Sequence, residues 1–152
     1  MIPGFLREEA GRRRPFLEAF VDLASHQQSG TVEFLVDTGA DNTVLSPRDA
    51  ALLGINVALL PPGVSSTGVG GTTLTVTAPA RLSVGPHTYF LDLRILAPQT
   101  GRERAVLEHI PSLLGRDVLA HFALFYEDGE DLVLLLEPDE ARELRRNLPS
   151  LA

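Results

Sequence analysis

From Pro15 onward, the chain alternates short apolar runs with clusters of Gly, Pro, Asn and Asp. Within the runs, apolar residues either alternate with polar ones or stand together over a few positions, which is typical of strands. A chain made of many such runs is predicted to be all-β. The expected strands are Phe16–Ala24, Thr31–Val36, Asn42–Leu45, Thr72–Val84, Thr88–Leu96, Ala123–Tyr126 and Leu132–Leu136, the last two joined by a tight turn at Asp128-Gly129.

Three short helices are expected among these strands. Ser46 can cap a helix over Pro47–Leu53, because its side chain accepts hydrogen bonds from free amides and proline suits the first helical position. A second short helix is expected at Arg116–Ala120, and a third, strongly charged, at Asp139–Asn147. Residues 97–109 are polar and irregular in pattern, so we expect a surface loop there.

The length of 152 residues fits one domain with its own core. We expect residues 1–14 to form a flexible N-terminal arm, residues 15–137 the folded domain, and residues 138–152 a helical tail. No stretch approaches the roughly 20 apolar residues of a membrane-spanning helix, and the first residues lack the apolar segment of a signal peptide. These features predict a soluble, cytoplasmic protein with no membrane partner.

Charge and composition exclude several kinds of function. The 20 acidic residues outnumber the 13 basic ones, and the formal net charge of −7 disfavours a nucleic acid partner. Every basic residue is Arg, so neither a Schiff-base lysine nor a P-loop lysine is available. The chain has no Cys, and His26, His87, His109 and His121 share no ligand spacing, so we expect no metal and no other cofactor.

Residues 34–43, FLVDTGADNT, place a carboxylate at the end of an apolar run. Leu35 and Val36 need a core, and Gly39 permits a tight turn that brings neighbouring amides close to Asp37. A carboxyl group held rigidly beside apolar surroundings is suited to proton transfer. The same residues also fit an Asx-type turn that only closes a hairpin, and the tripeptide Asp-Thr-Gly alone favours that simpler interpretation.

Three segments, in this order, resemble the retropepsins, the retroviral-type aspartic proteases and their cellular and bacterial relatives. The segment LVDTGADNTVL matches the family signature of an apolar pair followed by Asp-Thr-Gly-Ala. Further along, STGVGGTTLTV resembles the glycine-tipped flap that closes over the substrate, although its glycines also fit an ordinary flexible hairpin. Residues 110–122, IPSLLGRDVLAHF, are similar to the second signature, an apolar pair followed by Gly, Arg and then Asn or Asp. This resemblance implies that Leu113 and Leu114 form a buried strand beneath the loop of Asp37, with Gly115 giving room.

The resemblance implies a retropepsin-like acid protease fold, which is a closed β-barrel with a flap hairpin and a short helix, here extended by the helical tail. It assigns the catalytic positions to Asp37, Thr38 and Gly39. The single Asp-Thr-Gly supplies only one of the two carboxylates that such an enzyme needs, so the implied assembly is a homodimer. The implied activity is aspartic endopeptidase hydrolysis of a peptide or protein by an Asp-activated water.

The resemblance also assigns supporting residues. Arg116 would form an ion pair with Asp41 and brace the loop, and Asp117 would assist, although an aspartate also suits a plain helix start. The positions expected to contact the substrate are Leu35, Ala40, Asp41, Asn42, Val44, Gly68, Val69, Gly70 and Gly71. Two alternatives stay open. One is a non-catalytic peptide-binding or dimerisation module that keeps the fold, and the other is one part of a longer polyprotein or membrane protein.

Overall fold

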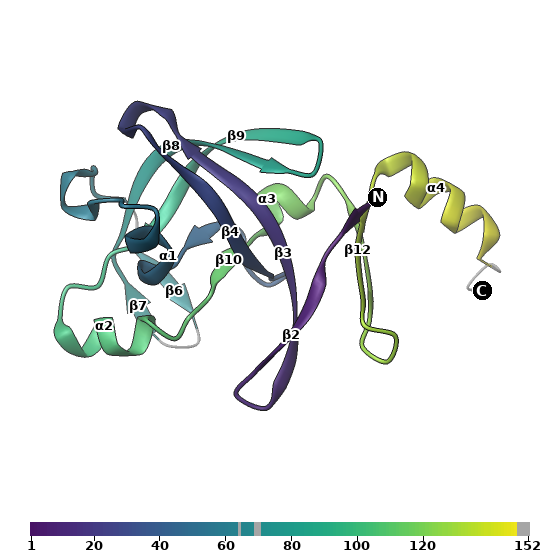
Figure 1. The fold of residues 1–152 in the computed structure, drawn as a ribbon, viewed down its shortest axis with the longest axis horizontal. Helices are drawn as coiled ribbons and strands as arrows, with labels where there is room; N and C mark the ends of the chain where they lie inside the picture. Colours follow the sequence, from purple (N-terminus) through teal and green to yellow (C-terminus); the bar gives the residue numbers. More distant parts are fainter. Residues whose placement is uncertain (64, 69–70, 149–152) are drawn as a thin grey trace.

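The computed structural model describes residues 1–63, 65–68 and 71–148, and its main feature is a β-barrel (Figure 1). The barrel strands lie in the order β3-β4-β10-β5-β9-β8, and the pairing of β3 with β8 closes it. The predicted all-β fold with a closed barrel is therefore confirmed. The strands are β3 (Arg12–Leu23), β4 (Gln28–Val36), β5 (Val44–Leu45), β8 (Thr75–Val84), β9 (His87–Leu96) and β10 (Ser112–Leu114).

The barrel interior is filled by the inward-facing residues of these strands. In β8, every second residue from Val76 to Val84 is buried, and in β4 the buried positions are Val32, Phe34 and Val36. A period of two follows from the strand pleat, which points successive side chains to opposite faces. The alternation seen in the sequence thus decides which side of each strand forms the core.

The predicted flap is present as the hairpin of β6 (Ser66–Gly68) and β7 (Gly71–Thr73), with Gly68 paired with Gly71. The expected tip residues Val69 and Gly70 lie outside the described residues. We expected one strand over Thr72–Val84, and the structure instead ends β7 at Thr73 and begins β8 at Thr75. A break between the two strands lets the hairpin leave the barrel wall.

The helices α1 (Pro47–Leu52), α3 (Arg116–Leu119) and α4 (Pro138–Asn147) lie where the sequence predicts them. Ser46 caps α1 as expected, with its side chain accepting a hydrogen bond from the amide of Asp49 at 3.2 Å. The described residues also contain two short 3-10 turns, η1 (Ala24–His26) and η2 (Val57–Leu59).

The prediction of an irregular loop over residues 97–109 is wrong, because this segment contains α2 (Gly101–Leu107). The Thr100 hydroxyl accepts a hydrogen bond from the amide of Glu103 at 3.1 Å, and the Glu103 carboxylate accepts one from the amide of Gln99 at 2.7 Å. These two bonds satisfy amides at the start of the helix, as a capping box does. Leu107 is buried and anchors the helix to the body.

The expectation of a flexible arm over residues 1–14 also differs from the structure, which places these residues in strands. β1 (Ile2–Pro3) pairs with a later strand, and β2 (Phe5–Glu9) forms a hairpin with β3. Ile2 is buried, and the ring of Phe5 stacks on that of Phe16 with centroids 6.0 Å apart. An ion pair between Arg7 and Glu33 adds a link to β4.

A second, three-stranded sheet has the order β1-β12-β11, with β11 (Ala123–Glu127) at its edge and β12 (Leu132–Leu136) in the centre. The predicted hairpin is confirmed, but its turn differs from the expected tight turn at Asp128-Gly129. The loop covers residues 128–131, and Asp131 adopts the left-handed conformation, with φ of 56°. The strand β12 leads into α4, which lies at the end of the molecule away from the barrel (Figure 1). Ala141 is the buried residue of this helix.

No helix in residues 1–63, 65–68 and 71–148 combines the length and apolar character needed to cross a bilayer.

Candidate active site

Asp37 follows directly on β4, and its backbone continues the pairing of that strand. The amide of Asp37 donates a hydrogen bond to the carbonyl of Leu114, the last residue of β10, at 3.1 Å. Since β4 is buried on one face and paired along its length, the residue after it inherits a fixed position. Asp37 itself is half-buried, so its carboxylate sits between the protein interior and solvent.

The turn after Asp37 orients the carboxylate. The amide of Gly39 donates a hydrogen bond to Asp37 Oδ1 at 2.9 Å, and the amide of Ala40 donates one to the Asp37 carbonyl at 3.2 Å. A Cβ atom at Gly39 would lie 3.1 Å from Asp37 Oδ1, a tight contact, so glycine gives this approach the most room. Thr38, the third residue predicted to be catalytic, is exposed at the tip of the turn.

The loop that carries Asp37 is crossed from below by β10. Leu113 pairs with Leu35 of β4 in the parallel direction and with Val44 of β5 in the antiparallel direction. One strand therefore separates the two arms of the loop, and Leu114 on it is fully buried. The sequence predicted this passage of Leu113 and Leu114 beneath the loop, and the structure confirms it.

The backbone of α3 closes the loop from the other side. The amide of Arg116 donates a hydrogen bond to the carbonyl of Ala40 at 2.8 Å, and the amide of Asp117 donates one to the carbonyl of Asp41 at 3.2 Å. The first amides of a helix have no partner inside the helix. Here they bind the carbonyls of the Asp37 loop, which gives the short helix after the second signature a structural role.

Gly115 permits this close approach of backbone to backbone. A Cβ atom at Gly115 would lie 2.3 Å from the carbonyl carbon of Asn42 and 2.8 Å from the amide nitrogen of Thr43. No side chain fits into that space. The glycine of the second signature is therefore required by packing, as the sequence analysis expected.

Asp117 has a stronger structural role than the sequence indicated. Its carboxylate accepts hydrogen bonds from the amide of Thr43 at 2.9 Å and from the Thr43 hydroxyl at 2.7 Å. The Thr43 hydroxyl in turn accepts one from the amide of Gly115 at 3.2 Å. Thr43 is fully buried, and sequence reasoning missed it; the only signal was a polar residue directly before the apolar pair Val44 and Leu45.

The predicted ion pair between Arg116 and Asp41 is present within one chain. Both side chains are largely exposed, Arg116 by 60% and Asp41 by 72%. Exposed ion pairs contribute little to stability, because water solvates both partners and salt screens them. The pair is therefore better suited to orienting the loop surface than to holding the fold together.

Replacing Asp by Ala should lower the free energy of unfolding by different amounts at two positions in this region. Asp117→Ala removes both acceptors of the buried Thr43, and we expect the free energy of unfolding to fall by about 2 kcal/mol. Asp41→Ala removes an exposed ion pair, and its cost should stay below about 1 kcal/mol. Urea denaturation of the two variants beside the parent protein measures the difference. Equal costs would mean that the Asp117 and Thr43 bonds add nothing beyond a surface contact.

The remaining residues that were predicted to contact the substrate differ in how exposed they are. Leu35, Ala40 and Asn42 are half-buried around the loop, while Asp41 is exposed. Val44 is buried and packs in a small apolar cluster with Leu96 of β9 and Leu107 of α2. Val44 is buried because α2, a helix that the sequence did not predict, packs against it within the single chain.

The described residues contain no group of three or more His, Asp or Glu side chains that could hold a metal ion. Around the loop the structure places the oriented Asp37 carboxylate, the exposed hydroxyl of Thr38, the amides of the turn, and the ion pair of Asp41 with Arg116.

Comparison with known proteins gives a family and a fold. A family model described as "gag-polyprotein putative aspartyl protease" matches residues 25–121, whereas curated proteins give no match. The fold is similar to that of a retropepsin-like aspartic protease from Rickettsia conorii, with 22% identity, a TM-score of 0.55 and coverage of 87% of each chain. It is also similar to EIAV protease complexed with the inhibitor HBY-793, with 20% identity, a TM-score of 0.52 and coverage of 75% of this chain and 92% of that chain.

Proposed function

The chain belongs to the gag-polyprotein aspartyl protease family, and we propose that it is an aspartic endopeptidase whose active site forms between two copies of the chain. The observation that carries the proposal is the placement of Asp37. Its backbone continues the pairing of β4 with β10, and its Oδ1 accepts the Gly39 amide at 2.9 Å. An aspartate that only closed a hairpin would not need a second strand and a helix to fix its position.

The reaction needs two carboxyl groups, and a two-fold axis supplies them. In an isologous dimer the same loop of each chain meets at the axis, so each copy contributes Asp37. Two carboxyl groups about 3 Å apart cannot both ionise, so the pair shares one proton, as in aspartic proteases generally. Any measured pKa then belongs to the pair.

In this pair the ionised Asp37 accepts a proton from a water molecule, and the protonated Asp37 of the other copy polarises the scissile carbonyl. The water oxygen adds to the carbonyl carbon and gives a tetrahedral intermediate. Transfer of a proton to the peptide nitrogen then breaks the carbon–nitrogen bond, and the products are a carboxylic acid and an amine. Thr38 is exposed at the turn, and in the proposed dimer it contacts the loop of the other copy.

The substrate is proposed to be a peptide in extended conformation. The flap hairpin of β6 and β7 presents main-chain hydrogen-bonding groups, and strand-like binding uses such groups for affinity and side-chain pockets for specificity. Leu35 is half-buried at the start of the loop and favours apolar substrate side chains. Val44 is buried in a cluster with Leu96 and Leu107, so we propose that it supports the loop from within and does not touch the peptide.

The dimer is proposed to use the edge of the three-stranded sheet. Leu124, Phe125 and Tyr126 on β11 are exposed, and β11 is an edge strand whose outer side has no neighbouring strand in the sheet. Apolar edge strands tend to pair with another chain. Pairing of β11 with the same strand of a second copy would cover these side chains.

The proposal is tested by measuring peptide cleavage and association on the same samples. A peptide library is digested over a range of protein concentrations, and sedimentation gives the fraction of dimer at each concentration. We expect the cleavage rate per chain to rise with the fraction of dimer and a peptide-like aspartic protease inhibitor to bind only the dimer. Full activity of a monomer would overturn the shared site. A stable dimer that binds peptides without cutting them would favour the peptide-binding module instead.

A further inference from the structure

The arm that leaves the catalytic loop is joined to β10 by little strand pairing. β5 is only two residues long, Val44 and Leu45; both residues pair with β9, but only Val44 pairs with β10. By contrast, the arm that enters the loop, β4, pairs with β10 at three positions and with β3 along most of its length. The position of β5 against β10 therefore depends on side-chain contacts more than the position of β4 does.

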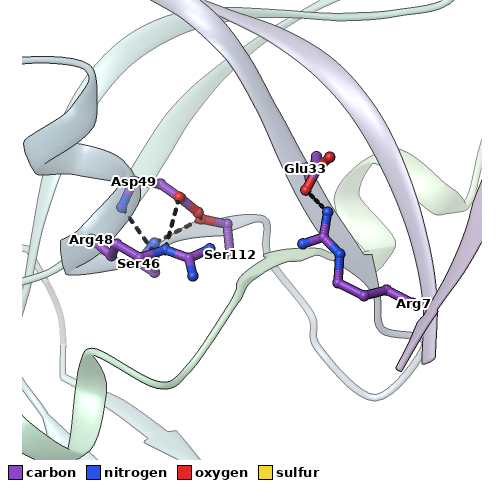
Figure 2. A network of polar contacts seen from close by, with 6 residues as sticks. All are labelled: Arg7, Glu33, Ser46, Arg48, Asp49 and Ser112. Atoms are coloured by element: carbon purple, nitrogen blue, oxygen red, sulfur yellow. Dashed lines mark hydrogen bonds and ion pairs between the residues drawn. The ribbon is translucent and has the colours of Figure 1, made fainter. Parts of the chain in front are cut away.

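A buried polar network lies at the end of β5 and joins it to β10 (Figure 2). The amide of Ser46 donates a hydrogen bond to Ser112 Oγ at 2.9 Å, and Ser112 Oγ donates one to Asp49 Oδ2 at 2.6 Å. The amide of Asp49 returns a bond to Ser46 Oγ at 3.2 Å. We call Ser46, Asp49 and Ser112 the α1 clamp.

The α1 clamp is enclosed by the protein. Ser46 and Ser112 are fully buried and Asp49 is nearly so, and Arg48 makes a longer contact from its Nε to Asp49 Oδ1 at 3.4 Å. A buried carboxylate is expensive unless hydrogen bonds satisfy it, and replacing such groups by apolar ones is often neutral or stabilising. Stability alone is thus a weak reason for a carboxylate at this position.

The geometry of the α1 clamp gives a better reason for the buried carboxylate of Asp49. Ser112 pairs through its backbone with Phe34 of β4, and its hydroxyl binds both Ser46, which follows β5, and Asp49 of α1. One residue of β10 therefore contacts both arms of the catalytic loop. At the opposite end of β5, Asp117 binds Thr43 in the same manner, through side-chain hydrogen bonds.

We propose that Ser112 and Asp49 are positioning residues for the catalytic loop, which set the separation of β4 and β5 and thereby the place of Asp37. This inference rests on the proposed function, in which two Asp37 carboxyl groups must meet at the axis. Displacing a reacting group by about 1 Å can lower the rate by about 100-fold. A loop with one poorly fixed arm would allow such a displacement without unfolding.

The test compares Ser112→Ala and Asp49→Ala with two matched variants. Asp49→Asn keeps an amide oxygen that can accept the Ser112 hydrogen bond, and Ser83→Ala removes a hydroxyl whose partner, Thr88, lies on the distant β8–β9 hairpin. We expect Ser112→Ala and Asp49→Ala to lower kcat about 10- to 100-fold with little change in KM, at a temperature where each variant is folded and dimeric. Asp49→Asn should retain most of kcat, and Ser83→Ala should match the parent protein.

Hydrogen exchange provides a readout that does not depend on activity. In Ser112→Ala, the amides of residues 38–43 should exchange faster than in the parent, while those of residues 81–90, where β8 and β9 pair with each other away from β5, should not change. If both alanine variants lower the melting temperature but cleave like the parent when folded, or if exchange rises evenly over the chain, the positioning role is wrong. If the parent itself does not cleave peptides yet exchange rises only in the loop, the proposed function fails and the positioning of the loop stands.

Discussion

Replacing Asp37 by Asn is expected to abolish peptide cleavage while leaving the fold and the dimer intact. The amide cannot accept a proton from water at neutral pH, and it cannot share a proton with the second carboxyl group. Proton transfer by a positioned group commonly contributes up to about 10⁴-fold, so we expect kcat to fall by at least about 10³-fold. Near-UV circular dichroism and sedimentation establish that the variant is folded and dimeric.

Mixing the two proteins makes this prediction specific to a shared site. When Asp37→Asn chains are added in excess to a fixed amount of parent protein, most parent chains enter dimers with only one Asp37. Cleavage should then fall as the excess grows. The matched control is Asp92→Asn, the same change at an exposed aspartate on β9, which should not inhibit. Activity that stays constant on mixing would show that one Asp37 is sufficient.

The second large effect is expected from Gly115→Ala. The added methyl carbon would lie 2.3 Å from the carbonyl carbon of Asn42 and 2.5 Å from its oxygen, and these are backbone atoms that cannot rotate away. Either β10 or the catalytic loop must move. Overpacking usually costs 1 to 3 kcal/mol, and occasionally more; here we expect a loss of about 3 kcal/mol in the free energy of unfolding. Cleavage should be lost together with stability, because the displaced loop carries Asp37.

Gly101→Ala is the matched control for this experiment. A Cβ atom at Gly101, the first residue of α2, would meet no atom within 4 Å. Chemical denaturation of both variants should give a large loss for Gly115→Ala and little change for Gly101→Ala. If Gly115→Ala is as stable as the control, then the loop and β10 are not packed as closely as the structure describes.

The period of apolar residues was sufficient to predict an all-β chain, and the resemblance to the retropepsins predicted the closed barrel and the core of the candidate site. Strand pleating imposes a period of two, and that period is visible in residues such as those of β8. The Asp37 turn was also readable, because Asp-Thr-Gly after an apolar pair leaves few arrangements. The place of Gly115 was also predictable, because it belongs to the second signature, which is a local motif in the sequence.

The features that were missed depend on contacts between distant segments or on weak local signals. The strands of residues 1–14 form because Phe5 stacks on Phe16 and Ile2 finds a buried site, and neither contact is visible in a charged, glycine-containing segment. The helix α2 had a readable signal, Thr100 followed three residues later by Glu103, but its polar composition concealed it.

The α1 clamp contains one contact that the sequence predicted and one that it did not. Ser46 was predicted to cap α1, because a serine before a proline at a helix start is a local pattern. The hydrogen bond from Ser112 to Asp49 joins residues that are 63 positions apart, and no local pattern announces it. Sequence reasoning therefore found the cap and missed the contact that gives the network its proposed role.

The crossing of the catalytic loop by β10 has a consequence for how the protein is made. Thr43 and Asp117, which join the loop to α3, lie 74 positions apart along the chain. Closing so long a stretch of chain costs entropy before the contacts compensate, so such contacts generally form late in folding. During synthesis the barrel strands up to β9 emerge first, and Asp37 gains its final surroundings only when residues 112–117 arrive. A newly made chain should therefore pass through a stage in which much of the barrel has formed and the Asp37 loop has not yet reached its final position.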